Sequence, residues 1–423
     1  MSNQQLALYF FLQLTCILLI CRVAGRLMTL IGQPRVIGEM IAGVLLGPSL
    51  LGLVAPSLQA ALFPPQTLQT MSVVSQLGLV LYMFVVGTHL QIDFIRHAYR
   101  GAMLISIAGV VAPFVLGAGL AAVLYQRGEF FTPAISQWQS MMYLGAAMAV
   151  TAFPVLARIL QDRGISGTAL GTLALTSGAA NDAIAWCLLA IVLSSLSGDA
   201  AVAVLAIAGG VAFTVVVLGL LRPQLAKLAV VVDRHESLRP SMLTAILTLL
   251  MASAWVTDTI GIHAVFGAFV MGVSMPRGTV TNELERQIEP LASGLLIPLF
   301  FVYSGLSTRV NLLASPRLCA VAVVVIVIAS AGKGVACWAA ALLAGRPSRE
   351  AMAIGALMNA RGLMELIILN IGLDRGLITP TLFTIMVGMT IVTTVAAGPA
   401  FEWAWRRSPN AVAVPAPLAT SKQ

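Results

Sequence analysis

Asp182 is a carboxylic acid in the middle of a long apolar segment, LALTSGAANDAIAWCLLAIVL, and Asn181 directly precedes it. Burial without a partner disfavours the charged form, so this acid should hold a proton when its surroundings are dry. Water and a cation would make the ionised form competitive. We therefore predict a site that holds either a proton or a metal ion. The structural alternative is a carboxylate locked in a salt bridge with Lys333 or Arg361.

Thr151-Ala152-Phe153-Pro154 lies in the middle of another apolar segment. A proline inside a helix removes a hydrogen bond and clashes with the carbonyl four residues earlier. At membrane depth, such a break is tolerated only where it lines a cavity or is buried in protein. We expect main-chain carbonyls and the Thr151 hydroxyl to be available there to a cation. A plain proline kink is the alternative interpretation.

Lys333 lies deep within the apolar run VVVIVIASAGKGVACWAAALLAG, among small residues that allow close helix approach. Its ammonium could neutralise facing helix C-termini or pair with Asp182.

A second polar group, Asn359, Arg361, Gly362 and Glu365, occurs in ALMNARGLMELIILNIG. Arg361 and Glu365 are four residues apart, so they could form an ion pair. The Asn-Ala-Arg-Gly run predicts a second interrupted helix, paired with the one at Pro154. For this group we favour a structural or dipole-balancing role over direct ion ligation.

The composition defines the elements that must position these groups. Of the 423 residues, 59% are hydrophobic and 9% are charged, whereas soluble domains carry roughly 25% charged residues. This excludes a soluble globular enzyme, and the net charge of +8 comes from few charges rather than from the basic runs of a nucleic-acid-binding chain. No phosphate loop, nucleophile triad or His/Cys metal cluster occurs in the sequence, so we expect no enzyme activity and no cofactor.

A bilayer-spanning helix needs about 20 apolar residues, which predicts an all-α polytopic membrane protein with about thirteen transmembrane helices. One transmembrane domain, 1–405, is expected, followed by a short disordered tail, 406–423. The predicted spans are 5–21, 36–54, 70–89, 102–125, 139–160, 167–195, 200–221, 241–257, 262–275, 292–307, 318–343, 351–372 and 379–402.

The distribution of basic residues supports this topology, because cytoplasmic loops collect Lys and Arg. With the N-terminus outside, 18 Lys and Arg residues fall on the cytoplasmic side and 4 on the opposite side. We therefore expect a cytoplasmic C-terminus. Broken helices at corresponding places in the two halves indicate an inverted-repeat transporter with a site at the membrane midplane.

The sequence resembles monovalent cation:proton antiporters of the Kef/CHX type, which have a sodium/hydrogen exchanger-like membrane domain. The resemblance runs from about residue 10 to residue 400. It rests on six motifs: GEMIAGVLLGPSLLG at 38–52, LGLVLYMFVVGTHL at 77–90, TAFPVLARIL at 151–160, AAND at 179–182, LFFVYSGLST at 299–308 and MNARGLMELIILNIGLDRG at 358–376.

This resemblance implies two crossed broken helices, a dimerisation domain and a mobile core domain, in a homodimer surrounded by lipid. The core helices would lie near 102–195 and 318–402, and the scaffold helices near 5–89 and 200–307. Asp182 would bind the ion or proton, with Asn181 as its neighbour, Thr151 contributing from the break and Lys333 facing the site.

The chain departs from some relatives of this type. Electrogenic members have two acidic residues where this chain has Asn181-Asp182. Many Kef-type members have Gln-Asp there and carry a cytoplasmic regulatory domain, and plant-type members carry a large C-terminal domain. We expect this chain to have neither domain.

With one titratable acid in the pair, we expect electroneutral one-for-one exchange of K⁺ or Na⁺ for H⁺ across the cell membrane, with alternating access. Kef/CHX likeness favours K⁺. Two alternatives stay open: a cation channel that uses the same carboxylate, and a sodium-coupled organic-anion symporter with Lys333 or Arg361 at its substrate.

Overall fold

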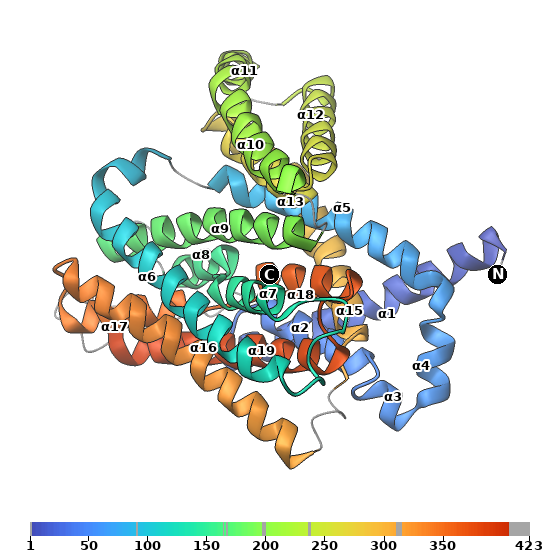
Figure 1. Ribbon diagram of the computed structural model, residues 1–423. Helices are drawn as coiled ribbons and strands as arrows, with labels where there is room; N and C mark the ends of the chain where they lie inside the picture. Colours follow the sequence, from blue (N-terminus) through green and yellow to red (C-terminus); the bar gives the residue numbers. More distant parts are fainter. Residues whose placement is uncertain are drawn as a thin grey trace. The chain divides into compact units, whose positions relative to one another are not determined.

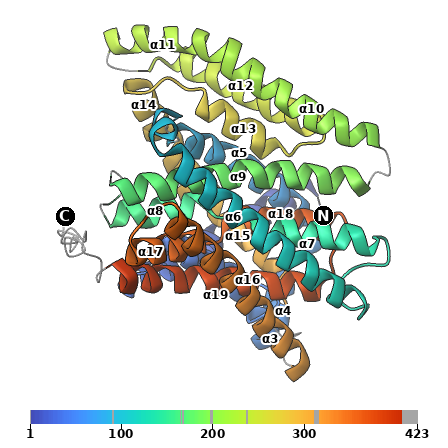
Figure 2. The same cartoon turned by 60° about the vertical axis from the view of Figure 1, so that its left-hand side comes forward.

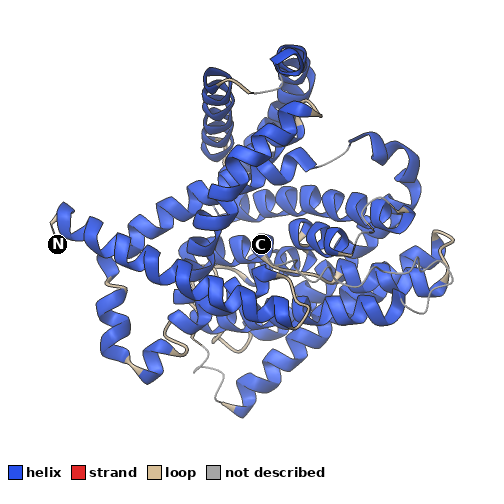
Figure 3. Ribbon diagram, turned by 180° about the vertical axis from the view of Figure 1, so that it is seen from behind, coloured by secondary structure: helices blue, strands red, loops and turns tan. Residues whose placement is uncertain are grey.

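The computed structural model describes residues 2–89, 92–163, 165, 168–196, 200–235, 238–309 and 315–405. Some side chains within these ranges also lie outside the description, including those of Pro154 and Asp182. The described chain is helical (Figure 3). Phe131 and Ile378 form an isolated antiparallel β-bridge. The predicted tail 406–423 lies outside the described residues.

The helices follow one another along the chain as drawn in Figure 1. They are α1 (Asn3–Leu30), α2 (Arg35–Leu46), α3 (Leu51–Val54), α4 (Pro56–Leu62), α5 (Pro65–His89), α6 (Ile92–Tyr125), α7 (Gln137–Ala149), α8 (Phe153–Asp162), α9 (Ala169–Leu196), α10 (Ala200–Val216), α11 (Arg222–His235), α12 (Pro240–Thr259), α13 (Ala264–Val273), α14 (Thr279–Leu291), α15 (Ile297–Leu306), α16 (Pro316–Leu343), α17 (Ser348–Met358), α18 (Leu363–Asp374) and α19 (Pro380–Trp405), with π-helical turns η1 (Val217–Leu221) and η2 (Ala292–Leu296).

Each of the thirteen predicted spans coincides with a helix or with a pair of helical pieces. Within the described residues, ten helical segments are long and apolar enough to cross a membrane. The span predicted at 139–160 is divided into α7 and α8, and the span predicted at 351–372 into α17 and α18. Both interruptions fall where the sequence predicts a broken helix.

The chain divides into two compact units, and three of the five boundaries between them fall inside α1, α9 and α15. The first unit contains 1–22, 50–91 and 190–305, and the second contains 23–49, 92–189 and 306–423. The second unit differs from the predicted core grouping in that it includes 23–49. Whether the units act as scaffold and transport domain stays a prediction.

Close backbone contact holds the first unit together where α5 meets α13. A Cβ atom at Gly87 on α5 would lie 3.0 Å from the Cα of Gly272 on α13, so two glycines allow the helices to touch. Between α1 and α5, the buried amide of Gln13 donates a hydrogen bond to the Thr67 hydroxyl at 2.7 Å.

The second unit packs α6 against α7 and α16, while α17 and α19 pack beside α16 (Figure 2). Its apolar core includes Leu156 on α8, Leu173 on α9 and Ile354 on α17. Both broken helices belong to this unit, so one packed core holds the two breaks.

Candidate functional site

The first break is the non-helical stretch 150–152 between α7 and α8. α7 begins with a capping box in which Ser136 and Gln139 satisfy each other's backbone amides, and it ends at Ala149. Val150 has φ −65° and ψ 144°, outside the helical region. Pro154 then falls in the first turn of α8, where a missing N–H group costs nothing. The proline therefore starts the second piece rather than kinking one continuous helix.

Two of the residues predicted to bind the ion, Asn181 and Thr151, are in contact at this break. The Asn181 Nδ2 atom on α9 donates a hydrogen bond to the Thr151 Oγ1 atom at 3.0 Å, and both residues are fully buried. The other amide atom, Asn181 Oδ1, is buried without a hydrogen-bond partner among the described atoms. Asp182 follows on α9, and its side chain lies outside the description.

The second break, Asn359–Gly362, crosses the first. The backbone N–H group of Ala152 donates to the carbonyl oxygen of Ala360 at 3.0 Å, which joins the two unwound segments directly. A Cβ atom at Gly362 would lie 3.2 Å from the Cγ2 atom of Val155, so glycine allows this close approach. The structure thus contains the predicted pair of interrupted, crossed helices.

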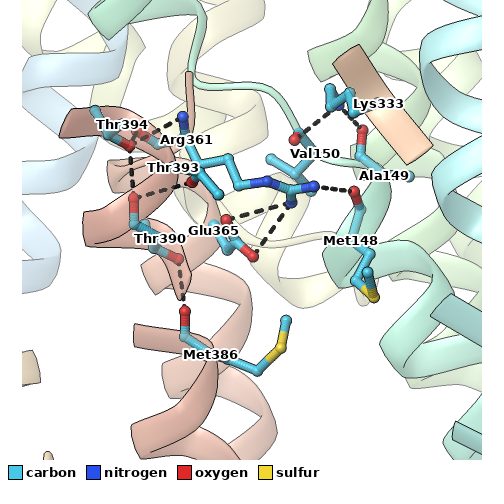
Figure 4. A network of polar contacts seen from close by, with 10 residues as sticks. All are labelled: Met148, Ala149, Val150, Lys333, Arg361, Glu365, Met386, Thr390, Thr393 and Thr394. Carbon is cyan, nitrogen blue, oxygen red and sulfur yellow. Dashed lines mark hydrogen bonds and ion pairs between the residues drawn. The ribbon is translucent and has the colours of Figure 1, made fainter. Parts of the chain in front are cut away.

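Two cationic side chains bind the carbonyl groups at the C-terminal end of α7 (Figure 4). Lys333 Nζ on α16 donates to the carbonyl oxygens of Ala149 and of Val150, the latter at 2.8 Å. Arg361 Nη2 donates to the Met148 carbonyl oxygen at 2.9 Å. A helix C-terminus has carbonyls without intrahelical partners and a partial negative charge. Lys333 and Arg361 therefore supply hydrogen-bond donors to these carbonyls and positive charge beside the helix end.

Arg361 also pairs with Glu365, its Nη1 atom lying 3.4 Å from a carboxylate oxygen, and both side chains are fully buried. The pair links the break to the first turn of α18, where a negative charge is favourable. A buried ion pair is stable only when its remaining groups find hydrogen bonds. Arg361 finds one such partner in the Met148 carbonyl, and its Nε atom has none among the described atoms.

Thr394 on α19 holds the backbone of the second break, and the sequence analysis did not identify it. Its hydroxyl accepts a hydrogen bond from the Arg361 N–H group at 3.1 Å and lies 2.6 Å from the Arg361 carbonyl oxygen (Figure 4). The same hydroxyl lies 2.6 Å from the Thr390 carbonyl oxygen within α19. The available signal was a set of threonines, Thr390, Thr393 and Thr394, in an otherwise apolar helix.

The structure places the predicted residues in two groups around the crossing. Asn181 and Thr151 form one contact, and Lys333, Arg361 and Glu365 surround the end of α7. Asn359 is the C-cap of α17, and its Oδ1 atom is buried without a partner among the described atoms. Within the described part of the chain, no three His, Cys, Asp or Glu side chains gather as a metal site. Amide, hydroxyl and main-chain oxygen atoms of described residues lie at this crossing.

Apolar helices long enough to span a membrane, together with two interrupted helices that cross beside buried bases, form the architecture of a broken-helix secondary transporter. The chain belongs to the transmembrane sodium/hydrogen exchanger family, whose sequence profile matches residues 15–407.

Named relatives cover most of the chain. The Na⁺/H⁺ antiporter NhaS4 of Synechocystis is 40% identical over 383 residues, which are 90% of this chain and 93% of the relative. Cation/H⁺ antiporter 19 of Arabidopsis thaliana is 37% identical and K⁺/H⁺ antiporter 1 of Saccharomyces cerevisiae 32% identical, over 92% and 94% of this chain. The chain spans only 48% and 46% of the lengths of these last two proteins.

A solved structure shares the fold. The sodium proton antiporter MjNhaP1 from Methanocaldococcus jannaschii superposes with a TM-score of 0.62 over 94% of this chain and 97% of that one. Its sequence identity of 14% restricts this likeness to the fold.

Proposed function

We propose that this protein is a secondary antiporter that exchanges a monovalent cation for protons. The observation that carries the proposal is the buried contact of Asn181 with Thr151, at the crossing of two broken helices and one residue from Asp182. Membership of the sodium/hydrogen exchanger family and relatives named as Na⁺/H⁺, cation/H⁺ and K⁺/H⁺ antiporters support the same function.

Asp182 is the group that alternates between the two substrates. As the single acid of the pair, it is neutralised either by one proton or by one monovalent cation. The loaded, neutral site crosses the membrane barrier, whereas the bare carboxylate is too costly to move. Exchange is then one-for-one and electroneutral, with alternating access. Thr151 and Asn181 supply further oxygen ligands, while Lys333, Arg361 and Glu365 balance the helix ends.

The transported cation is K⁺ or Na⁺. Carbonyl, amide and hydroxyl oxygens suit both ions, and relatives at 40% and 32% identity are named for Na⁺ and K⁺ respectively. The Kef/CHX likeness favours K⁺ as the first substrate to test.

The assembly that we propose is a homodimer in the cell membrane, with the N-terminus outside and the C-terminus in the cytoplasm. The excess of Lys and Arg on one side, 18 against 4, supports this orientation. The compact unit that contains both breaks is the transporting core, and the other unit is the scaffold.

Purified protein in proteoliposomes with an imposed pH gradient tests the function. Adding K⁺, Na⁺, Li⁺ and Rb⁺ in turn should dissipate the gradient for the transported ions, and Asp182→Asn should abolish this exchange without unfolding the protein. A voltage-sensitive dye in the same vesicles should show no sustained potential.

Four outcomes would contradict the proposal or one of its parts. Cation flux without opposing proton movement would indicate a channel, and sodium uptake that depends on an organic anion would indicate a symporter. Residual pH-driven cation flux in the Asp182→Asn variant would remove this acid from the mechanism. A sustained potential during exchange would exclude one-for-one stoichiometry.

A further inference from the structure

Gly109 on α6 is the point where three helices of the second unit meet behind the candidate ion site. A Cβ atom at this position would lie 3.1 Å from Asn181 Nδ2 on α9 and 2.8 Å from Cys337 Sγ on α16. Distances below 3.0 Å are not reached by real Cβ atoms, and 3.1 Å is tighter than nearly all of them. Only glycine fits without moving a neighbour.

Both neighbours of Gly109 are close to the candidate ion site. Asn181 holds the Thr151 hydroxyl at 3.0 Å and has a buried Oδ1 atom with no partner among the described atoms. Cys337 lies four residues after Lys333 on α16, one helical turn from the ammonium that binds the α7 carbonyls. The backbone of α6 at Gly109 therefore lies directly against the Asn181 amide.

The contact between α6 and α16 continues along both helices (Figure 2). Gly332, next to Lys333, packs against α6, where a Cβ atom would lie 2.6 Å from Leu116 Cδ1 and 3.8 Å from Pro113 Cα. Glycines on both helices thus set a short interhelical distance at the depth of the site. Pro113 also withholds the N–H group that would bond the Gly109 carbonyl in a regular helix.

We propose that Gly109 is a positioning residue that determines ion selectivity, because the absence of its side chain lets the Asn181 amide lie close against α6 while it bonds Thr151 Oγ1, a position that suits a larger cation. This rests on the proposed exchange function. A methyl group at position 109 moves the amide by a few tenths of an ångström, away from α6 and against the first break. The space left for an ion becomes smaller, so the variant binds small cations in preference to large ones.

The test compares Gly109→Ala with wild type in proteoliposomes, measuring the apparent KM for Li⁺, Na⁺, K⁺ and Rb⁺. The ratio of the KM for K⁺ to the KM for Na⁺ should rise by about tenfold, the low end of what one methyl group changes in a pocket. Gly119→Ala is the matched control, because it adds the same methyl to the same helix at a position with nothing within 4 Å. It should keep the wild-type ratio.

A second variant guards against misfolding. Combining Gly109→Ala with Cys337→Ala removes the overlap with the thiol and leaves the contact with Asn181, and Cys337→Ala alone is its reference. The double variant should still show the raised ratio. If Gly109→Ala exchanges ions with the wild-type ratio, if the double variant exchanges them with the ratio of Cys337→Ala, or if either loses activity equally for every ion, the role of Gly109 is contradicted. If wild type exchanges no ion, the proposed function fails, and this inference fails with it.

Discussion

At the scale of single residues, Lys333, Arg361 and Glu365 are ionisable groups with fully buried side chains. The contacts give each a partner: carbonyl oxygens at the end of α7 for the two bases, and Arg361 for the acid. Charges at membrane depth are costly without such partners. Removing one partner should therefore cost more than removing a comparable charge at the surface.

Replacing Lys333 by Met should destabilise the protein by about 1–3 kcal/mol, because the Ala149 and Val150 carbonyls lose their donor while remaining buried. Lys333→Gln should cost less, since its amide can still donate. The measurement is thermal unfolding of the purified protein in detergent. Lys227→Gln is the control, because Lys227 is exposed on α11. Equal stability of the Met variant and wild type would contradict the capping role.

Glu365→Gln should destabilise the protein by about 3–5 kcal/mol, because it leaves the fully buried Arg361 guanidinium without its counter-ion. Chemical unfolding in detergent measures this change. Glu283→Gln is the comparison: it breaks an ion pair with Arg286, whose side chain is 71% exposed, and should alter stability little. The idea is wrong if the two substitutions have the same small effect.

At the scale of elements, the second break is a stretch of backbone tied to neighbouring helices. Ala360 accepts a hydrogen bond from the first break, and Arg361 uses both of its backbone groups on Thr394 of α19. Unwound backbone inside a membrane is tolerated when protein satisfies it in this way. The shape of the crossing therefore depends on α19 as well as on the two broken helices.

Thr394→Val keeps the shape of the side chain but removes the hydroxyl, leaving both Arg361 backbone groups without that partner. We expect a loss of about 1–3 kcal/mol in stability and faster hydrogen exchange across 359–363, measured by mass spectrometry. Thr393→Val is the matched neighbour, because the hydrogen bond of its hydroxyl among the described residues stays within α19, to the Thr390 carbonyl at 3.2 Å. Thr394→Ser should restore slow exchange. Similar exchange in the two Val variants would contradict the anchoring by Thr394.

At the scale of the whole molecule, hydropathy predicted thirteen spans, and each coincides with one or two of the described helices. Ten helical segments among the described residues are long and apolar enough to cross a membrane. Both breaks were also predictable, since Pro154 and the Asn-Ala-Arg-Gly run are strong interruptions of an apolar helix. Hydropathy treats the chain one segment at a time. It therefore indicated that Lys333 and Arg361 are buried without showing that they meet at the same helix end.

The contacts that join distant segments could not be predicted from the sequence. Thr394 resembles any threonine that bonds its own helix, and 33 residues separate it from Arg361. Gly109 is one of 37 glycines, and nothing in its sequence neighbours distinguishes a position that touches Asn181 from one that faces open space. Such pairs depend on how helices cross, which the apolar pattern of each helix leaves undetermined.

The central claim is that a proton and a cation compete for one carboxylate at position 182. The direct measurement is proton release from weakly buffered protein in detergent when K⁺ or Na⁺ is added, with Asp182→Asn as the reference. The account predicts up to one proton released per cation bound by wild type, less as the pH is raised and the acid is already ionised, and none by the variant. Cation binding to wild type without proton release at any pH, or equal release by both proteins, would contradict it.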